Sequence, residues 1–343
     1  MFNSYIHMPA LLRRLAPALV AVGLLASAAQ VGAQPARPPT KVRYEEVIRS
    51  VLYLPMYVAL QRGYFRDAGL DVAMKTSQGT DKGMAALLSG SADIVLIGPE
   101  ASVYVANSES PVKPKIFAGL TATDGFLLMS RKPASGPFNW NQLKGKSLMS
   151  FRPGSNPDVF LEAALRKHGL DPKKDLKLVS NIGPAARTGA WLAGQNDYAI
   201  FLEPEAGNLE KDGTGYVMAA IGNEVGPVDY TVFTTTDVYM QKNPEVLQAW
   251  TRAVARAQKY VQTAPAGDLA AHVAEYFPGV SQPELVRAIE RYRGYKLWKT
   301  TPLVEKAATD RLQDMLSASG VLDAGKRVKY EQIVVTDFAS KVD

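Results

Sequence analysis

One stretch of the sequence occurs twice, and this doubling constrains the fold more than any other feature. Ala86 to Ala101 reads ALLSGSADIVLIGPEA, and Ala190 to Ala206 reads AWLAGQNDYAIFLEPEA. In each copy the apolar end of a helix meets a glycine, Gly90 or Gly194, which can take the left-handed C-cap conformation. An acid and a run of four apolar residues follow. A short apolar run without polar alternation is typical of a strand covered on both faces, which favours parallel pairing between two layers of helices.

Each copy ends in a Pro-Glu pair at the carboxyl end of the expected strand. Ligands bind at the carboxyl ends of strands in open α/β sheets. The doubled stretch therefore predicts an α/β protein with two lobes whose half-sites face each other.

The N-terminus has the pattern of a secretory signal. Arg13-Arg14 precede the apolar stretch Leu15 to Ala26, and the small residues Val31-Gly32-Ala33 follow. Twelve residues are too few to span a membrane, for which about 18 are needed. We expect a signal peptide over residues 1–33 that is cleaved near Ala33, and export to the periplasm.

Composition excludes several classes of protein. The chain has 343 residues, enough for two domains. Without residues 1–33 it keeps 37 basic and 33 acidic groups, a net charge of +4, and no basic block typical of nucleic-acid binding. The absence of cysteine excludes disulfides, thiolate metal sites, a cysteine nucleophile and a lipidated N-terminal cysteine. We expect a monomer without nucleic-acid partners or stable membrane insertion.

Signatures of enzymes are missing from the sequence. There is no G-x-S-x-G motif, and the nearest phosphate-loop match, GVLDAGKR at Gly320 to Arg327, has arginine where the Mg²⁺-binding Ser or Thr belongs. His168 and His272 have no second ligand at metal spacing. We therefore expect neither catalysis nor a metal or other cofactor.

The rest of the chain alternates between strand and helix patterns, as in a parallel α/β sheet. The sequence predicts strands over residues 41–48, 71–75, 115–120, 146–151 and 176–179, and helices over 55–62, 155–168, 283–298, 302–318 and from 244 onward. The stretch 131–143, rich in Pro, Gly and Asn, is expected where the chain has crossed into the second lobe, and 229–235 where it returns. Trp250 and Trp298 lie in helical patterns and are expected in the core.

Polar loops follow the predicted strands, and several of them open a helix. Helix N-termini offer unpaired N–H groups and partial positive charge to oxyanions. Tyr53 and Tyr57 can stack on a flat ligand, while Arg152 suits an oxyanion. The candidate loops are Arg49 to Tyr57, Gln78 to Asp81, Gly98 to Glu100, Thr121 to Asp124, Arg152 to Asn156, Asn181 to Arg187 and Leu202 to Glu205.

These residues carry a family resemblance. The motifs are YLPMYVA at Tyr53 to Ala59, GYF at Gly63 to Phe65, GLDV at Gly69 to Val72, Leu88-x-Gly90-x-x-Asp93, GPEA at Gly98 to Ala101, and Thr121 to Gly125. Together they resemble the solute-binding proteins of ABC importers for nitrate, sulfonate, taurine and thiamine precursors.

The resemblance implies a type II periplasmic-binding fold, with two α/β lobes, two crossing strands and a hinge around a small-molecule ligand. It implies a discontinuous first lobe of residues 41–127 and 235–343, including the C-terminal helices, and a second lobe of residues 128–234. An ABC permease and its ATPase are the implied partners.

The expected ligand-binding residues come from both lobes. By similarity Tyr53, Gln78, Thr80 and Glu100 face the ligand from one lobe, and Arg152, Ser155 and Glu203 from the other. The candidate loops add Arg49, Tyr57 and Thr123.

The sequence leaves the ligand open. A sulfonate-like oxyanion would use Arg152, Ser155 and Thr80. A planar aminopyrimidine-like ring would instead use the two tyrosines and the acids Glu100, Glu203 and Glu205. Two other functions remain: an exported ligand-sensing domain, and an enzyme like the relative that makes the thiamine pyrimidine, although that enzyme's cysteine-rich motif has no counterpart here.

Overall fold

The computed structural model describes residues 1–2 and 38–342. The predicted signal peptide, apart from its first two residues, and its cleavage near Ala33 lie outside the described residues. Residues Pro39–Asp343 form the compact unit that carries the fold.

This unit alternates short strands with helices. The strands are β1 (Thr40–Glu46), β2 (Leu70–Thr76), β3 (Ile94–Ile97), β4 (Pro114–Thr121), β5 (Leu127–Ser130), β6 (Ser147–Met149), β7 (Lys177–Val179), β8 (Tyr198–Phe201), β9 (Tyr216–Ala220) and β10 (Thr231–Thr236). The helices are α2 (Leu54–Gln61), α3 (Tyr64–Asp67), α4 (Thr80–Leu88), α5 (Glu100–Ala106), α6 (Asn156–Lys167), α7 (Arg187–Leu192), α8 (Glu205–Lys211), α9 (Ile221–Val225), α10 (Asp237–Lys242), α11 (Pro244–Thr263), α12 (Ala266–Val273), α13 (Gln282–Gly294), α14 (Lys306–Ala318) and α15 (Tyr330–Ile333).

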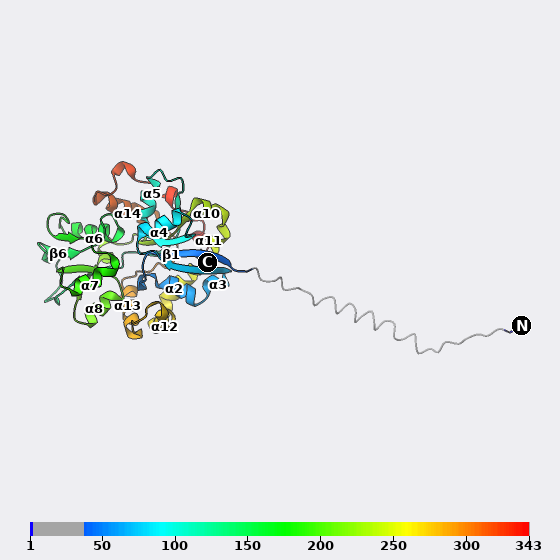
Figure 1. Ribbon diagram of the computed structural model, residues 1–343, viewed down its shortest axis with the longest axis horizontal. Coiled ribbons are helices and arrows are strands. Elements are labelled where there is room, and N and C mark those ends of the chain that lie inside the picture. Colours follow the sequence, from blue (N-terminus) through cyan, green and yellow to red (C-terminus); the bar gives the residue numbers. More distant parts are fainter. Residues whose placement is uncertain (3–37, 343) are drawn as a thin grey trace. The chain divides into compact units, whose positions relative to one another are not determined.

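The strands form two five-stranded sheets with the same layout. Their orders are β2-β1-β3-β10-β4 and β7-β6-β8-β5-β9. We call the first sheet with its helices the first lobe and the second sheet with its helices the second lobe. In Figure 1 the green helices α6, α7 and α8 gather around the second sheet, while the blue strand β1 lies on the opposite side. The prediction of a two-lobed α/β fold is confirmed.

The sheets are mixed rather than wholly parallel, which corrects the expectation from the apolar strands. β1 pairs in parallel with β2 and β3, but β10 runs antiparallel to β3 and β4. β5 is likewise antiparallel to β8 and β9. In each sheet the antiparallel strand is the one that the chain has brought over from the other lobe.

The doubled stretch forms the same unit in both lobes. Gly90 has φ of 74° and Gly194 has φ of 81°, the left-handed conformation predicted for both. The strands β3 and β8 follow them, and α5 and α8 begin beyond Pro99 and Pro204. The local prediction for both copies is confirmed.

The acid of each copy ties its strand to the neighbouring strand. Asp93 accepts a hydrogen bond of 2.8 Å from the backbone N of Arg43 in β1. Asp197 accepts one of 2.9 Å from the backbone N of Ser147 in β6. In both pairs the acid lies 50 residues after its partner, so the repeated unit also includes β1 in the first lobe and β6 in the second.

The chain crosses between the sheets twice. It leaves the first sheet after Thr121 and enters the second at Leu127, so the chain has already crossed when it reaches the stretch 131–143, as expected. It returns between Ala220 and Thr231. The lobe boundaries at 127/128 and 234/235 remain predictions.

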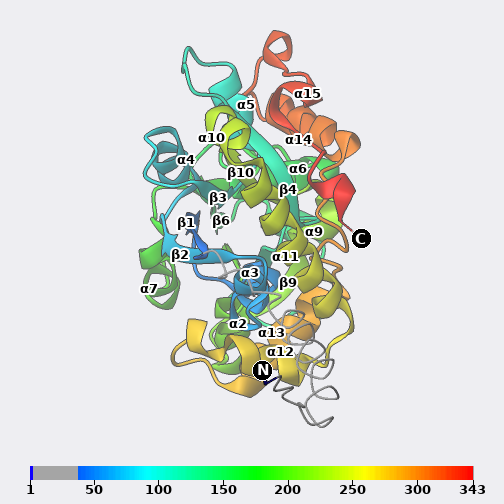
Figure 2. The same ribbon diagram turned by 90° about the vertical axis from the view of Figure 1, so that its right-hand side faces the viewer.

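The C-terminal helices cover the first sheet and reach the second lobe. Trp250 of α11 is fully buried, and Trp298 Nε1 donates to the Leu52 carbonyl at 2.9 Å. Both tryptophans therefore lie in the core, as predicted. Helix α11 runs alongside β4 (Figure 2), while α13 contacts α8 and α14 contacts α6.

Candidate functional site

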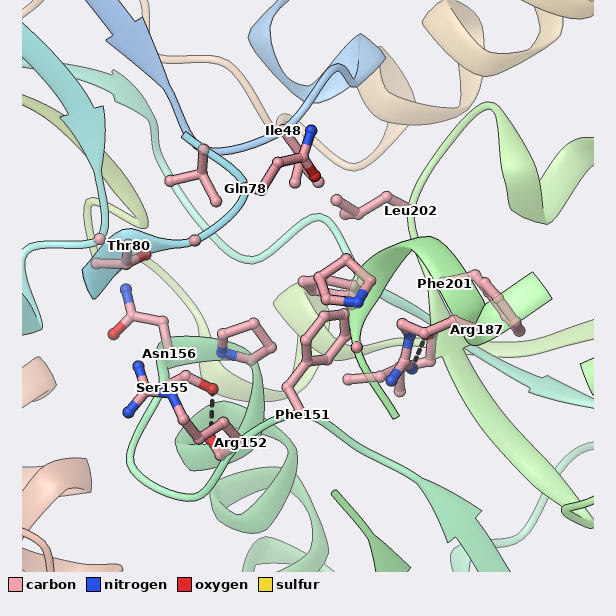
Figure 3. Close-up of a pocket in the computed structure, with 18 of the residues that line it drawn as sticks. Ile48, Gln78, Thr80, Phe151, Arg152, Ser155, Asn156, Arg187, Phe201 and Leu202 are labelled. Carbon is pink, nitrogen blue, oxygen red and sulfur yellow. Dashed lines mark hydrogen bonds between the residues drawn. The ribbon is translucent and has the colours of Figure 1, made fainter. Parts of the chain in front are cut away.

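A cavity of about 590 Å³ lies between the two lobes. Its wall is formed where β1, β2 and β3 of the first sheet and β6, β7 and β8 of the second reach their carboxyl ends. In Figure 3, Ile48, Gln78 and Thr80 lie across the cavity from Phe151, Arg152 and Asn156. The lining residues are Val47–Arg49, Leu52, Tyr53, Gln78–Lys82, Gly98, Phe126, Phe151, Arg152, Ser155–Pro157, Ser180–Ala185, Arg187, Thr188, Ile200–Leu202, Glu205, Tyr230 and Thr231.

One part of the wall combines two helix N-termini with a cationic side chain. Helix α4 begins at Thr80 and α6 at Asn156, and both residues line the cavity. Ser155 Oγ donates to the carbonyl of Arg152 at 2.6 Å instead of capping α6. The Arg152 guanidinium lies 3.9 Å from Asp81 of the first lobe, with more than half of each side chain exposed. An oxyanion here would meet helix N-termini, hydroxyls and a guanidinium.

Gln78 supplies a backbone feature on the same side. Its φ is 62°, a left-handed conformation that is uncommon outside glycine. Backbone strain of this kind clusters at ligand sites, where the surrounding structure enforces it. Here it precedes α4 and places Gln78 on the cavity wall.

A second part of the wall combines apolar rings with a buried cation. Arg187 is 4% exposed, and its guanidinium donates to the carbonyls of Ser150, Met149 and Ile200. The guanidinium carbon lies 3.9 Å from the centre of the Phe151 ring, a cation–π contact. These contacts fix the guanidinium under the ring (Figure 3).

Burial and a nearby acid set the electrostatics of Arg187. Burial lowers its pKa to about 9, while the charge of Glu205 acts in the opposite direction. The Glu205 carboxyl is exposed to the cavity, yet surrounding protein atoms raise its pKa by desolvation. Arg187 therefore stays charged at neutral pH and gives this part of the wall a positive charge.

Arg49 is held at the cavity by an internal network. Its Nε lies 3.2 Å from Oε1 of the buried Glu46, and its guanidinium carbon lies 5.3 Å and 5.1 Å from the ring centres of Tyr57 and Tyr276. Desolvation raises the pKa of Glu46 to about 7, although the Tyr57 hydroxyl and Arg49 oppose this shift.

Part of the sequence-predicted site lies on the cavity wall. These residues are Arg49, Tyr53, Gln78, Thr80, Arg152 and Ser155. The structure brings them together from both lobes, and their contact with a ligand stays a prediction.

The structure turns three other predicted residues away from the cavity. Tyr57 packs inside the first lobe, where its hydroxyl donates to Glu46 at 2.7 Å. Thr123 Oγ1 lies 2.7 Å from the Gly226 carbonyl and 3.0 Å from that of Gly222, and its single proton joins the two crossing segments. Glu203 points to α13 and forms an ion pair of 2.6 Å with Arg291.

Glu100, the fourth, lies one layer behind the wall. It is 2% exposed, and a Cβ at the lining residue Gly98 would lie 2.0 Å from its Oε2. All four residues come after a strand, as predicted. The helices α2 and α5 and the neighbouring loops, however, direct the four side chains into the protein interior. That orientation depends on packing that strand order does not reveal.

Three residues that line the cavity lie in the candidate loops or directly beside them, but the sequence did not predict them as ligand-binding residues. Asn156 and Arg187 end two of the predicted loops, and Phe151 directly precedes one. The signal was available for Asn156, because it lies at the start of the helix predicted over 155–168, directly before Pro157. The burial of Arg187 under Phe151 has no local signal, since it depends on the packing of β6, β8 and α7.

The described residues, 1–2 and 38–342, contain neither a cluster suited to a metal ion nor a helix suited to crossing a membrane. No group of three or more His, Asp or Glu residues there could hold a metal ion. None of the helices in this part of the chain has the length and apolar character needed to cross a membrane.

Comparison with known proteins places this geometry in a family. The pattern of the NMT1/THI5-like family matches residues 52–267. YtlA of Bacillus subtilis strain 168, provisionally named a binding protein, is 37% identical over 304 residues, which cover 88% of this chain and 90% of YtlA. The taurine-binding periplasmic protein of Escherichia coli K12 is 27% identical over 175 residues, covering 51% of this chain and 52% of its own.

A solved structure supports the same fold. The alkanesulfonate-binding protein SsuA of Xanthomonas axonopodis pv. citri, bound to MOPS, matches with a TM-score of 0.70 at 18% identity. The match covers 88% of this chain and all of that one. The fold is therefore that of periplasmic binding proteins, and the chain belongs to the NMT1/THI5-like family of ABC-importer solute-binding proteins.

Proposed function

We propose that this protein captures a small organic oxyanion, such as a sulfonate with an apolar body, in the cavity between its lobes. The observation that carries the proposal is the sorting of the two candidate residue sets. Arg152, Ser155 and Thr80, the set expected for an oxyanion, all line the cavity. Of the ring-binding set, Tyr53 and Glu205 also line it, but Tyr57, Glu100 and Glu203 do not.

The charge of the wall supports an anionic ligand. Among the described residues that line the cavity, four basic side chains stand against two acidic ones, and Arg187 is buried. Two of the basic side chains, Arg49 and Arg152, have an acidic neighbour within 4 Å. Arg187 donates its hydrogen bonds to carbonyls, and Glu205 is the acid whose charge acts on it, so an anionic ligand would add to a countercharge that Glu205 already supplies in part.

The size and apolar part of the cavity support an organic body. A volume of about 590 Å³ exceeds what a bare inorganic anion fills. Leu52, Phe126, Phe151, Ile200 and Leu202 line it and would cover an alkyl or aryl group. The names of the taurine-binding and alkanesulfonate-binding relatives agree with this ligand class.

Membership of this family suggests how the protein retains its ligand and delivers it. The lobes close on the cargo by a hinge in the two crossing segments, and the loaded protein delivers it to an ABC permease with its ATPase. Relatives named as periplasmic support a periplasmic location. Residues Arg49, Tyr53, Gln78, Thr80, Arg152 and Ser155 contact the ligand in this proposal.

A ligand panel tests the proposal. Thermal unfolding is followed with alkyl and aryl sulfonates, matched carboxylates, nitrate and aminopyrimidines. A sulfonate at 100 times its Kd should stabilise the protein by about 2.7 kcal/mol, while nitrate and aminopyrimidines leave the midpoint unchanged. Stabilisation by an aminopyrimidine but by no oxyanion would overturn the ligand class.

A further inference from the structure

The carboxyl of Glu100 is buried at the contact between the lobes. Glu100 opens α5 of the first lobe and is 2% exposed. A Cβ at Gly98 would lie 2.0 Å from Glu100 Oε2 and 2.7 Å from Nδ2 of Asn156, so both side chains flank the same glycine. Asn156 opens α6 of the second lobe. The acid of one lobe therefore meets the helix N-terminus of the other beside the cavity.

Two acceptor oxygens at this contact have no donor. In the described part of the chain, neither Glu100 Oε2 nor Asn156 Oδ1 has a hydrogen-bond partner, and both atoms are buried. The Asn156 amide is oriented by its Nδ2, which donates to the Tyr230 carbonyl at 3.2 Å. An ionised carboxylate would leave Oε2 as a charged, buried acceptor without a donor, whereas a proton on Oε2 makes it a donor and removes the buried charge.

Two further contacts join the lobes beside this group. The Tyr104 hydroxyl of α5 donates to the Gly154 carbonyl of the second lobe at 2.7 Å. On the same side of the cavity, Arg152 approaches Asp81. Separation of the lobes would break both contacts, withdraw α6 from Glu100 and admit water to the carboxyl.

We propose that Glu100 takes up a proton when the two lobes close, so that it positions the Asn156 contact and makes closure more favourable at lower pH. The proposal rests on the proposed function only in assuming that the lobes move about a hinge. Glu100 is then a positioning residue that acts through the α6 N-terminus and need not contact the ligand.

The surroundings of Glu100 support this assignment. Burial raises its pKa to about 7, although backbone N–H groups, including that of Asn156, and the charge of Arg152 oppose the shift. The other titratable groups near it are the hydroxyls of Tyr53, Tyr104 and Tyr230, and burial raises the pKa of each. These hydroxyls stay neutral in the range where Glu100 titrates, so its own proton decides the charge.

Proton linkage gives the direction in which pH changes the closure equilibrium. The closed state binds the proton more tightly than the open state, so the closure constant falls as pH rises between the ordinary pKa of 4.5 and the closed-state pKa of about 7. One proton limits the change to about tenfold per pH unit. Below and above this range, the closure constant does not change with pH through Glu100.

The absence of cysteine allows a direct test without ligand. Nitroxide labels are attached to K75C in the first lobe and K173C in the second, both at exposed positions. Pulsed electron paramagnetic resonance then measures the distance between the labels from pH 4.5 to 8. The population with closed lobes should grow as pH falls in the wild-type background and become independent of pH in Glu100→Gln.

Glu46→Gln is the matched control. Glu46 is buried and its pKa is also raised to about 7, but its partners Tyr57, Arg49 and Thr76 all belong to the first lobe. This variant should keep the pH dependence of the distance. A flat profile in the wild-type background, or equal slopes with and without Glu100, would overturn the proposal.

A second measurement covers the case in which Glu100→Gln does not fold. Infrared difference spectra between pH 8 and 5 are compared for the wild-type protein and Glu100→Asp, which keeps a carboxyl at this position. Glu46 and Asp124 contribute the same protonated-carboxyl bands to both proteins, so the band of Glu100 is the one that differs, and it should grow with the closed population. Growth of closure without such a band would contradict the assignment. Neither measurement contains a ligand, so a failed sulfonate panel leaves this test intact.

Discussion

The Arg187 guanidinium lies 3.9 Å from the centre of the Phe151 ring, at the boundary between the cavity and the core of the second lobe. The same group joins the carboxyl ends of β6 and β8 through hydrogen bonds to Met149, Ser150 and Ile200. One side chain thus stabilises the sheet and supplies positive charge to the proposed ligand site.

Arg187→Met should destabilise the protein by about 2–4 kcal/mol, because buried carbonyls lose charged donors. Arg187→Lys should recover only part of this loss, since an ammonium cannot reproduce the planar set of donors. Urea unfolding measures both variants. Arg131→Met is the control, because Arg131 also lies over a ring, that of Trp191, but is less buried. An equal loss in the control would contradict the role of burial.

Arg152→Ala should weaken sulfonate binding by about tenfold, equivalent to a charged hydrogen bond of about 1.5 kcal/mol. We expect a loss of affinity at the low end of the range for charged hydrogen bonds, because 61% of the Arg152 side chain is exposed. Calorimetric titration with the best sulfonate of the panel checks the change. Arg166→Ala removes the same charge from an arginine that pairs with Glu162 and does not line the cavity. It should bind normally, and unchanged affinity in Arg152→Ala would remove this residue from the site.

Gly98→Ala should destabilise the protein by about 1–3 kcal/mol through overpacking. The new Cβ would lie 2.0 Å from Glu100 Oε2 and 2.7 Å from Asn156 Nδ2. Gly189→Ala is the control, because no atom lies within 4 Å of its Cβ position and it sits in helix α7. That variant should be neutral or slightly stabilising by helix propensity. Thermal unfolding compares the two, and equal midpoints would mean that the wall at Gly98 yields easily.

The free energy of unfolding should fall as pH rises from 5 to 8. Burial raises the pKa of Glu46 and of Asp124 to about 7, so the folded state binds their protons more tightly than the unfolded state. Each unit of difference is worth about 1.4 kcal/mol, and the contribution is lost as pH rises through the folded pKa.

Urea unfolding at several pH values measures this slope. Glu46→Gln should reduce it, because the amide does not titrate. Stability that increases steadily from pH 5 to 8 would show that these carboxyls are not desolvated in the folded protein.

The sequence by itself determined the repeated unit and hence the fold class. Gly90 and Gly194 permit the left-handed C-cap, and the four-residue apolar runs after Asp93 and Asp197 are typical of buried strands. These signals are local, since they depend on backbone conformation and on the side chains of adjacent residues. The loops that line the cavity could also be predicted locally, because each one directly follows the carboxyl end of a predicted strand.

Only the tertiary structure decided which side chains of those loops reach the cavity. Glu100 and Glu203 follow equivalent strands, yet packing against α6 and α13 turns both away from the wall. The antiparallel entry of β5 and β10 and the burial of Arg187 also depend on segments distant in sequence. Long-range packing sets these positions because a side chain's direction depends on the free volume and charge that other elements leave around it, which no local pattern encodes.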